Sequence, residues 1–283
     1  MRRKNILISA EDLNRKIDNP DVRIIDTRFS LFDPEKGKKL YNDNHIPNAV
    51  YANLDQDLAG KITKSSGRHP LPDINKLSKL FALWGISNGT HIIVYDAFNS
   101  AVAARLWWLV RWLGHKKVSV LNGGFKAWLK LNYKTDNTVP IFTKGNFESK
   151  ADRNLIWETN MISDWVKKKI PYILVDARER ERFKGIKEPI DKVAGHIPNA
   201  INIPFADFIN KNGTWKSVEV INKIWSKTRI NPHDEWGVMC GSGVTACHLA
   251  ISALLVGMKE PLLYVGSWSE WIACKTRPIT INE

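Results

Sequence analysis

The chain has 283 residues, of which 43% are hydrophobic and 25% are charged, and its mean hydropathy is −0.29. These values are typical of a globular protein of about two domains and exclude collagen, a coiled coil and a disordered chain. Three cysteines without paired spacing exclude a disulfide framework and a four-ligand zinc site, and they favour a reducing, cytoplasmic compartment. The apolar run near the N-terminus is too short for a signal peptide, and no segment has the apolar length of a membrane span.

The formal net charge of +13 is compatible with binding of nucleic acid, of an anionic membrane or of small anions. The basic residues fall in short groups, at 2–4, 36–39, 116–117 and 167–169, without a long stripe or a nucleic-acid-binding motif. A solvated basic surface explains this pattern better than a nucleic-acid site does. We therefore expect neither nucleic acid nor a membrane as a partner.

Short apolar runs alternate with longer stretches of helical periodicity along the chain. The expected helices are 101–113 and 246–256, and the expected buried strands are 24–25, 92–95, 118–121, 173–175, 237–239 and 262–265. Continuously apolar strands suit a parallel sheet that is covered on both faces. The alternation therefore predicts an α/β fold.

The second half of the chain repeats the first. Three motifs recur in the same order: Asp-x-Arg at 26–28 and 176–178, His-Ile-Pro-Asn-Ala at 45–49 and 196–200, and Gly-x-x-x-x-Trp at 123–128 and 266–271. We expect two copies of one domain, at 1–137 and 155–283, joined by a linker of turn-forming residues at 138–154. Residues present in both copies, namely the Asp and Arg pairs and the two histidines, are expected to be structural.

The copies differ after one strand, where the second copy reads Cys-Gly-Ser-Gly-Val-Thr from Cys240 and the first has Asp96. Gly241 and Gly243 permit the positive φ angles of a tight turn, in which backbone N–H groups surround the sulfur. Those groups and the N-terminus of the following helix favour the reactive thiolate and also hold an anionic sulfur or an oxyanion. Cys240 is therefore the candidate nucleophile, whereas Cys247 is expected to be buried.

These motifs cover nearly the whole chain and resemble the tandem-domain sulfurtransferases of the rhodanese type. The resemblance implies two rhodanese-like domains, each a parallel sheet flanked by helices on both faces, with a non-catalytic first copy and a catalytic second copy. It implies a persulfide on Cys240 and requires neither a metal nor an organic cofactor. The Gly-Ser-Gly that follows the cysteine is similar to the 3-mercaptopyruvate type, because the thiosulfate type has basic residues there.

In the mercaptopyruvate type, an Asp, a His and the loop Ser form a hydrogen-bonded group beside the cysteine. The matching catalytic positions here are Asp55, His69 and Ser242. The resemblance places the donor against Arg182 and against the loop residues Gly241, Gly243, Val244 and Thr245.

A second donor-binding arginine is expected after the Glu188-Pro189 pair, where this chain has Ile190. An isoleucine cannot bind a carboxylate. Either Lys187, Lys192 or another base takes its place, or the preferred donor differs.

The resemblance implies an enzyme that moves a sulfane sulfur from 3-mercaptopyruvate, a small anionic donor, to a thiol, cyanide or a thioredoxin-like protein. Two alternatives stay open: a thiosulfate sulfurtransferase, and a persulfide carrier or regulatory module without turnover. A cysteine phosphatase is disfavoured because it needs an arginine six positions after the cysteine, where this chain has Ala246.

Overall fold

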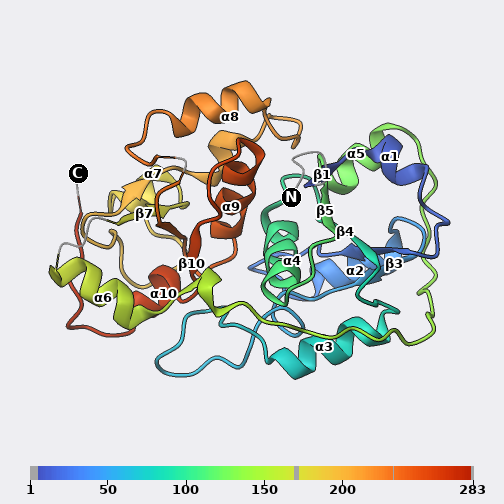
Figure 1. Ribbon diagram of the computed structural model, residues 1–283, viewed down its shortest axis with the longest axis horizontal. Coiled ribbons are helices and arrows are strands. Elements are labelled where there is room, and N and C mark those ends of the chain that lie inside the picture. The colour runs from blue at the N-terminus through green and yellow to red at the C-terminus, as the bar shows by residue number, and fades with distance from the viewer. Residues whose placement is uncertain (1–5, 169–171, 232, 282–283) are drawn as a thin grey trace. The chain divides into compact units, whose positions relative to one another are not determined.

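The computed structural model describes residues 6–168, 172–231 and 233–281, which divide into two compact units (Figure 1). The first unit contains the chain up to residue 60, residues 72–152 and residues 209–215; the second contains residues 61–71, 153–208 and the chain from 216 onward. The basic residues 2–4 and 169 lie outside the described residues. The domain boundaries expected from the sequence stay a prediction.

The first unit is built on a parallel sheet with the strand order β1-β5-β4-β2-β3. Its strands are β1 (Leu7–Ile8), β2 (Val22–Asp26), β3 (Ala49–Tyr51), β4 (His91–Tyr95) and β5 (Val118–Leu121). Its helices are α1 (Ala10–Asn14), α2 (Lys36–Asp43), α3 (Ile74–Leu83), α4 (Ala101–Trp112) and α5 (Gly124–Lys130). Leu13 of α1 and Phe125 and Trp128 of α5 share one core with the strands, and α4 packs on β4 and β5.

The second unit repeats this arrangement with the strand order β6-β10-β9-β7-β8, again parallel. Its strands are β6 (Ile156–Trp157), β7 (Ile173–Asp176), β8 (Ile201–Asn202), β9 (Trp236–Met239) and β10 (Leu262–Tyr264). Its helices are α6 (Thr159–Lys168), α7 (Arg180–Phe183), α8 (Val218–Trp225), α9 (Ala246–Leu255) and α10 (Ser267–Trp271), with 3-10 turns η2 (Arg153–Leu155) and η3 (Phe205–Phe208). Side chains of α6, α7 and α10 pack in one core with the strands, while α9 packs on β9 and α8 on α9. The predicted α/β fold with two tandem copies is confirmed.

The central strands are buried because helices cover both faces of each sheet, which is why they read as continuous apolar runs. In β9 every residue is buried, and in β4 every residue after His91 is buried. The predicted helix 246–256 corresponds to α9, whose residues are nearly all buried. Cys247 is buried within it, and its Sγ lies 3.3 Å from the carbonyl oxygen of Gly243.

The two Asp and Arg pairs close the carboxyl ends of equivalent strands, as expected from their recurrence. Arg28 Nη2 lies 2.7 Å from Asp26 Oδ2, and Arg178 Nη2 lies 2.7 Å from Asp176 Oδ2. All four side chains are buried. A buried pair of this kind needs all its hydrogen bonds, and both arginines also donate to backbone carbonyls.

The two recurring histidines are packing residues. His45 stacks on Tyr41 with ring centroids 4.0 Å apart, and His196 stacks on Phe183 at 3.7 Å. Each places Nδ1 on the carbonyl oxygen of its stacking partner, at 2.7 and 2.8 Å, and both are fully buried. These contacts fix the turns that follow α2 and α7.

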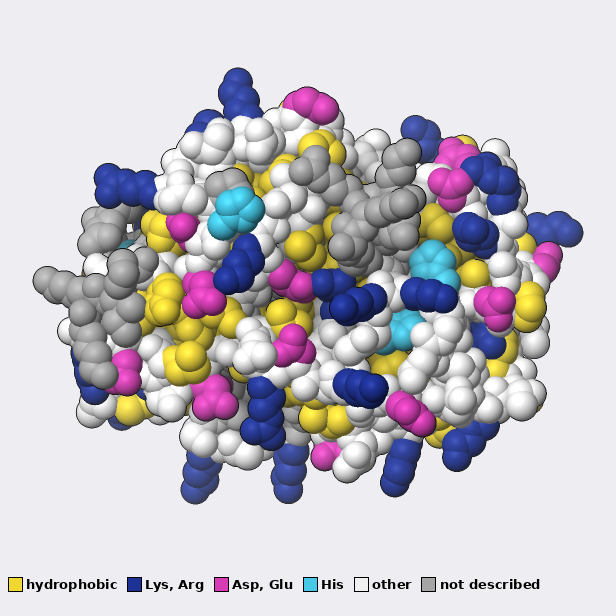
Figure 2. All heavy atoms as spheres, in the orientation of Figure 1, with side chains coloured by type: hydrophobic (Ala, Val, Ile, Leu, Met, Phe, Trp, Pro, Cys, Tyr) yellow, Lys and Arg dark blue, Asp and Glu magenta, His cyan; other side chains and the backbone are white. Residues whose placement is uncertain are grey.

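The basic charge is dispersed on the face of the molecule that Figure 2 draws. On the face drawn in Figure 2, Lys and Arg side chains stand singly or in small groups, with Asp and Glu side chains between them. No described helix is both long and apolar enough to cross a membrane.

Candidate active site

Cys240 directly follows β9, a strand that lies between β10 and β7 in the second sheet. Loops at the carboxyl ends of parallel strands are the usual place for ligand sites in α/β proteins. The loop runs from Cys240 to Thr245, and α9 begins at Ala246. Cys240 is a free cysteine with 2% of its surface exposed.

The first turn of α10 holds the carbonyl side of this loop. Trp268 N–H donates to the carbonyl oxygen of Cys240 at 3.0 Å, and Ser269 N–H donates to that of Gly241 at 2.9 Å. Cys240 N–H donates to Ser267 Oγ at 3.1 Å. Three hydrogen bonds therefore fix the backbone on which the thiol is carried.

The two loop glycines serve different purposes. Gly243 has φ +75°, and a Cβ there would lie 2.5 Å from the carbonyl oxygen of Val265, so this position requires glycine. The expectation that Gly241 also takes a positive φ angle is wrong. A Cβ on Gly241 would instead lie 3.0 Å from Arg68 Nη2 and 3.4 Å from Arg182 Nη2, so this glycine leaves room for two guanidinium groups.

The N–H groups of the loop point to an anion-binding turn. Within the described part of the chain, those of Ser242, Val244 and Thr245 donate to no protein acceptor. Unused N–H groups at the start of a helix attract negative charge. The loop can therefore stabilise an anionic sulfur on the cysteine.

The equivalent loop of the first unit supports the alignment of Asp96 with Cys240. Phe125 N–H donates to the carbonyl oxygen of Asp96 at 2.8 Å, and Lys126 N–H donates to that of Ala97 at 3.0 Å. These two bonds repeat the ones that α10 makes to Cys240 and Gly241. The loops thus share one backbone frame.

In the loop of the first unit, the backbone N–H groups are occupied by a side chain of the protein itself. The Asp96 carboxylate accepts hydrogen bonds of 3.0–3.3 Å from four backbone N–H groups, those of Phe98, Ser100, Val102 and Ala103. Burial raises the pKa of Asp96, and these four bonds oppose that rise. The first unit therefore shows the repeated loop binding an anion.

The structure brings two further predicted residues together in the second unit. His69 Nδ1 and Ser242 Oγ are hydrogen-bonded at 2.7 Å, although 173 residues separate them. Both side chains are buried, with 5% exposed. His69 reaches the loop because residues 61–71 cluster with the second unit.

Arg182, in α7, sits in a network of buried charges. Its Nε donates to both carboxylate oxygens of Glu188, at 2.9 and 3.0 Å, and its Nη2 donates to Asp191 Oδ2 at 3.0 Å. Burial raises the pKa of Glu188, but hydrogen bonds from Arg182 and from the N–H groups of Asp191 and Ile190 outweigh it, so the net pKa is lowered. The network orients the Arg182 guanidinium toward Gly241.

Arg68 is the residue of this network that sequence reasoning missed. Its Nη1 forms an ion pair with Asp191 Oδ1, so Asp191 bridges the two arginines. Its position directly before His69 was the signal available in the sequence. By contrast, Lys187 and Lys192 are exposed, and Ile190 is half-buried.

Asp55 belongs to the first unit and lies in a turn after β3. Its N–H donates to Asn53 Oδ1 at 2.9 Å. Partial burial of the carboxylate raises its pKa, although the residue as a whole is exposed.

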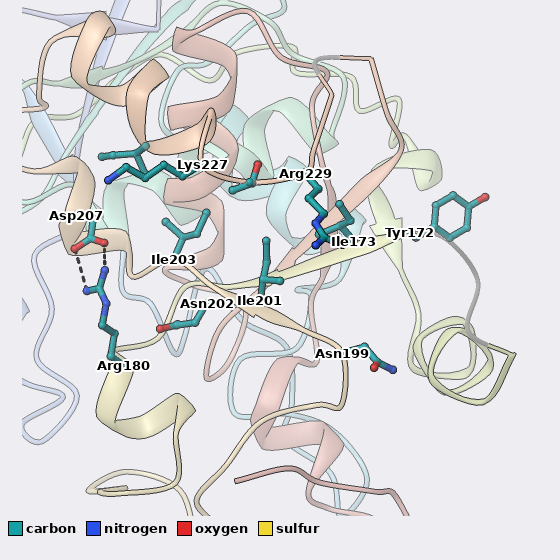
Figure 3. A pocket seen from close by; sticks show the side chains of 12 residues that line it. Tyr172, Ile173, Arg180, Asn199, Ile201, Asn202, Ile203, Asp207, Lys227 and Arg229 are labelled. Carbon is teal, nitrogen blue, oxygen red and sulfur yellow. Dashed lines mark hydrogen bonds and ion pairs between the residues drawn. The ribbon is translucent and has the colours of Figure 1, made fainter. Parts of the chain in front are cut away.

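A separate cavity of about 550 Å³ opens beside β8 in the second unit (Figure 3). Ile201 and Ile203 line its apolar part, and Arg180, from α7, pairs with Asp207 at its edge. None of the sequence-predicted site residues is among the described residues that line it.

Comparison with known proteins identifies two copies of one domain. A family model described as "Rhodanese-like domain" matches residues 9–131 and 162–274. The chain is 38% identical to a protein of Pseudomonas aeruginosa named "Probable 3-mercaptopyruvate sulfurtransferase", over 98% of each chain. It is 33% identical to the thiosulfate sulfurtransferase of Gallus gallus, over 88% of this chain and 86% of that one.

A solved structure shares the whole architecture. The crystal structure of SseA from Escherichia coli, described as a 3-mercaptopyruvate sulfotransferase with the "Rhodanese" fold, superposes with a TM-score of 0.82. The match covers 93% of this chain and 98% of that chain at 26% identity.

Proposed function

The chain belongs to the rhodanese-like domain family, and on that premise we propose that it is a sulfurtransferase that takes sulfur from 3-mercaptopyruvate through a Cys240 persulfide. One observation carries the proposal. The loop after the central strand binds an anion, the Asp96 carboxylate, in the first unit and presents a buried thiol in the second.

In the first step, the Cys240 thiolate attacks the sulfur of the donor. A sulfur–sulfur bond forms, the carbon–sulfur bond breaks, and its electron pair leaves on carbon as the enolate of pyruvate. The proton of the donor thiol is released, and one proton is taken up when the enolate becomes pyruvate, so protons balance. Arg182 stabilises the developing negative charge, because a guanidinium binds carboxylate and enolate oxygens through parallel N–H groups.

Ser242 and His69 supply the proton path in this proposal. Their 2.7 Å hydrogen bond lets the serine hydroxyl pass a proton while the imidazole receives or replaces it. Asp55 is assigned the role of orienting the histidine, as the family resemblance implies.

The persulfide is then held by the loop N–H groups of Ser242, Val244 and Thr245. A terminal persulfide sulfur is an anion at neutral pH, and in the first unit the Asp96 side chain accepts four hydrogen bonds from the N–H groups of the equivalent loop and the helix that follows it. The same donor geometry therefore suits both acceptors.

In the second step, the acceptor attacks the outer sulfur of the persulfide and restores the Cys240 thiolate. Cyanide leaves as thiocyanate. A dithiol or a thioredoxin-like protein first becomes a persulfide, and attack by its second thiol then forms a disulfide and releases the transferred sulfur as hydrogen sulfide. We place the enzyme in the cytoplasm, where its three free cysteines are kept reduced.

Thiosulfate is the second candidate donor. Relatives with that activity in their name share a third of their residues with this chain, and Ile190 stands where a second donor-binding arginine is expected.

The test compares turnover of 3-mercaptopyruvate and thiosulfate at equal concentration, with cyanide and a dithiol as acceptors. We expect 3-mercaptopyruvate to be preferred, Cys240→Ser to be inactive, and the wild-type mass to increase by one sulfur atom after the donor alone. Cys247→Ser is the matched control and keeps activity, because that thiol lies inside α9. A persulfide without multiple turnover indicates a carrier, and activity in Cys240→Ser overturns the proposal.

A further inference from the structure

Arg68 is anchored to the same elements that hold Cys240. Its N–H donates to Ser269 Oγ at 3.0 Å, and Ser269 N–H in turn binds the carbonyl oxygen of Gly241. The next residue, His69, is hydrogen-bonded to Ser242. The backbone of Arg68 is therefore tied to the loop on two sides.

The guanidinium of Arg68 is paired with that of Arg182 through one buried carboxylate. Asp191 accepts from Arg68 Nη1 through Oδ1 and from Arg182 Nη2 through Oδ2, and its side chain is 4% exposed. Glu188 is the second counter-ion of Arg182. Glu188 also pairs with Arg178, whose other partner is Asp176, so three positive and three negative groups leave this cluster without net charge.

Unused N–H groups of both arginines meet at Gly241. The Cβ position of Gly241 lies 3.0 Å from Arg68 Nη2 and 3.7 Å from Arg182 Nη1. Among the described residues, neither nitrogen has a protein acceptor, and Arg68 Nε is also buried without one. Arg68 Nε is a buried donor that calls for an acceptor, whereas Arg68 Nη2 and Arg182 Nη1 are accessible, so an acceptor that arrives with a ligand can reach them.

We propose that Arg68 determines donor specificity, binding the donor's carboxylate together with Arg182 beside Cys240. The inference rests on the proposed sulfurtransferase function and deepens it. The base missing at Ile190 is thereby supplied from residues 61–71, a different segment of the second unit.

Because the cluster has no net charge, it should bind some anions better than others. A planar carboxylate fits the parallel N–H groups of two guanidiniums and gains hydrogen bonds without needing excess positive charge. A compact dianion such as thiosulfate depends more on net positive charge, which Asp191 and Glu188 remove. The arrangement therefore favours 3-mercaptopyruvate over thiosulfate.

Two substitutions of Arg68 separate this role from a structural one. Arg68→Gln removes both the positive charge and the planar guanidinium with its parallel N–H groups. Arg68→Lys keeps the charge but loses the guanidinium. Arg180→Gln is the matched control, because Arg180 also makes an ion pair in the second unit but pairs with Asp207 beside the separate cavity.

The experiment measures KM and kcat for both donors, together with the melting temperature. For 3-mercaptopyruvate, we expect Arg68→Gln to raise KM about tenfold or more, as loss of charge-assisted hydrogen bonds predicts. We expect Arg68→Lys to raise this KM while leaving the KM for thiosulfate nearly unchanged. Arg180→Gln should leave both values at the wild-type level.

If KM changes equally for the two donors, or if the melting temperature falls while KM is unchanged, Arg68 has a structural role. Either result overturns the inference about Arg68 but leaves the proposed function standing. A wild-type protein that forms no persulfide from either donor overturns the proposed function as well. The wild-type measurement thus distinguishes the two failures.

Discussion

Changing Gly243 to alanine should lower the stability of the protein, whereas changing Gly241 to alanine should weaken donor binding. Gly243→Ala places a Cβ 2.5 Å from a fixed backbone oxygen at a positive φ angle, so we expect it to lose more than about 1 kcal/mol of stability. Gly241→Ala meets the flexible ends of Arg68 and Arg182, so we expect little change in melting temperature but a higher KM for the donor. Thermal melts and donor kinetics of both variants check this pair.

This prediction is contradicted if either variant departs from the behaviour expected of it. If Gly241→Ala also unfolds the protein, its position is needed for the backbone and the free space beside it has no role in donor binding. If Gly243→Ala melts like the wild type, the left-handed turn is not a requirement of the loop.

Asp191 limits the positive charge of the proposed donor site, because it pairs with both arginines. Asp191→Asn removes one negative charge between Arg68 and Arg182 and leaves the cluster with a net charge of about +1. We expect the KM for thiosulfate to fall and the preference to shift toward this dianion. Competition between the two donors in one assay measures the shift, and an unchanged ratio contradicts it.

Glu188 gives the second unit a pH-dependent stability. Because its pKa is lowered from an ordinary value of 4.5, its ionised form stabilises the folded state above that pH and the contribution is lost as the pH falls through the folded pKa. Glu188→Gln should cost about 1–3 kcal/mol at pH 7, and the difference from the wild type should shrink below pH 4.5. Urea unfolding at a series of pH values tests this, and a constant difference contradicts it.

At the scale of elements, the loop between a central strand and the following helix has the same backbone frame in both units. It carries Asp96 in the first unit and Cys240 in the second. In the first unit, four N–H groups close on the Asp96 carboxylate before α4 begins. Asp96→Ala leaves these buried donors without an acceptor, and we expect a loss of about 1–3 kcal/mol. Asp96→Asn keeps one oxygen acceptor and should lose less. Thermal unfolding of the two variants orders them, and equal stability would show that the cradle does not need its anion.

The elements themselves were predictable where their pattern is local. β4, β5, β7 and β9 are buried on both faces and read as apolar runs, and α4 and α9 follow from helical spacing. The edge strands β1, β6 and β8 have two residues each, too few for any periodicity, and they form because a neighbouring strand offers free hydrogen bonds.

The candidate site divides in the same way. The loop from Cys240 to Thr245 is contiguous, so its chemistry could be inferred from the order of the residues. His69 and Ser242 are 173 residues apart, so no local pattern could predict their hydrogen bond. The family resemblance was the only basis for expecting it. The ion pair of Arg68 with Asp191 spans 123 residues and follows no local pattern, so the fold was needed to reveal it.

At the scale of the whole molecule, the charge of +13 acts on small anions as they approach. On the face drawn in Figure 2 the basic side chains are dispersed, and we expect the excess of positive charge to raise the local concentration of anionic donors. Salt screens such long-range attraction, with a Debye length that shrinks from about 30 Å at 0.01 M to about 8 Å at 0.15 M. We therefore expect kcat/KM for both donors to fall over this range, more steeply for thiosulfate, because it carries two charges and 3-mercaptopyruvate carries one.

An uncharged acceptor provides the control for this steering. With the donor saturating and 2-mercaptoethanol varied, kcat/KM for the acceptor should stay constant over the same salt range, since a neutral thiol feels no long-range field. A fall for the neutral acceptor would mean that salt acts on the folded enzyme and not on the approach of anions. If the two donors respond equally, the surface charge does not distinguish them, and the proposed donor site at Arg68 and Arg182 sets the preference.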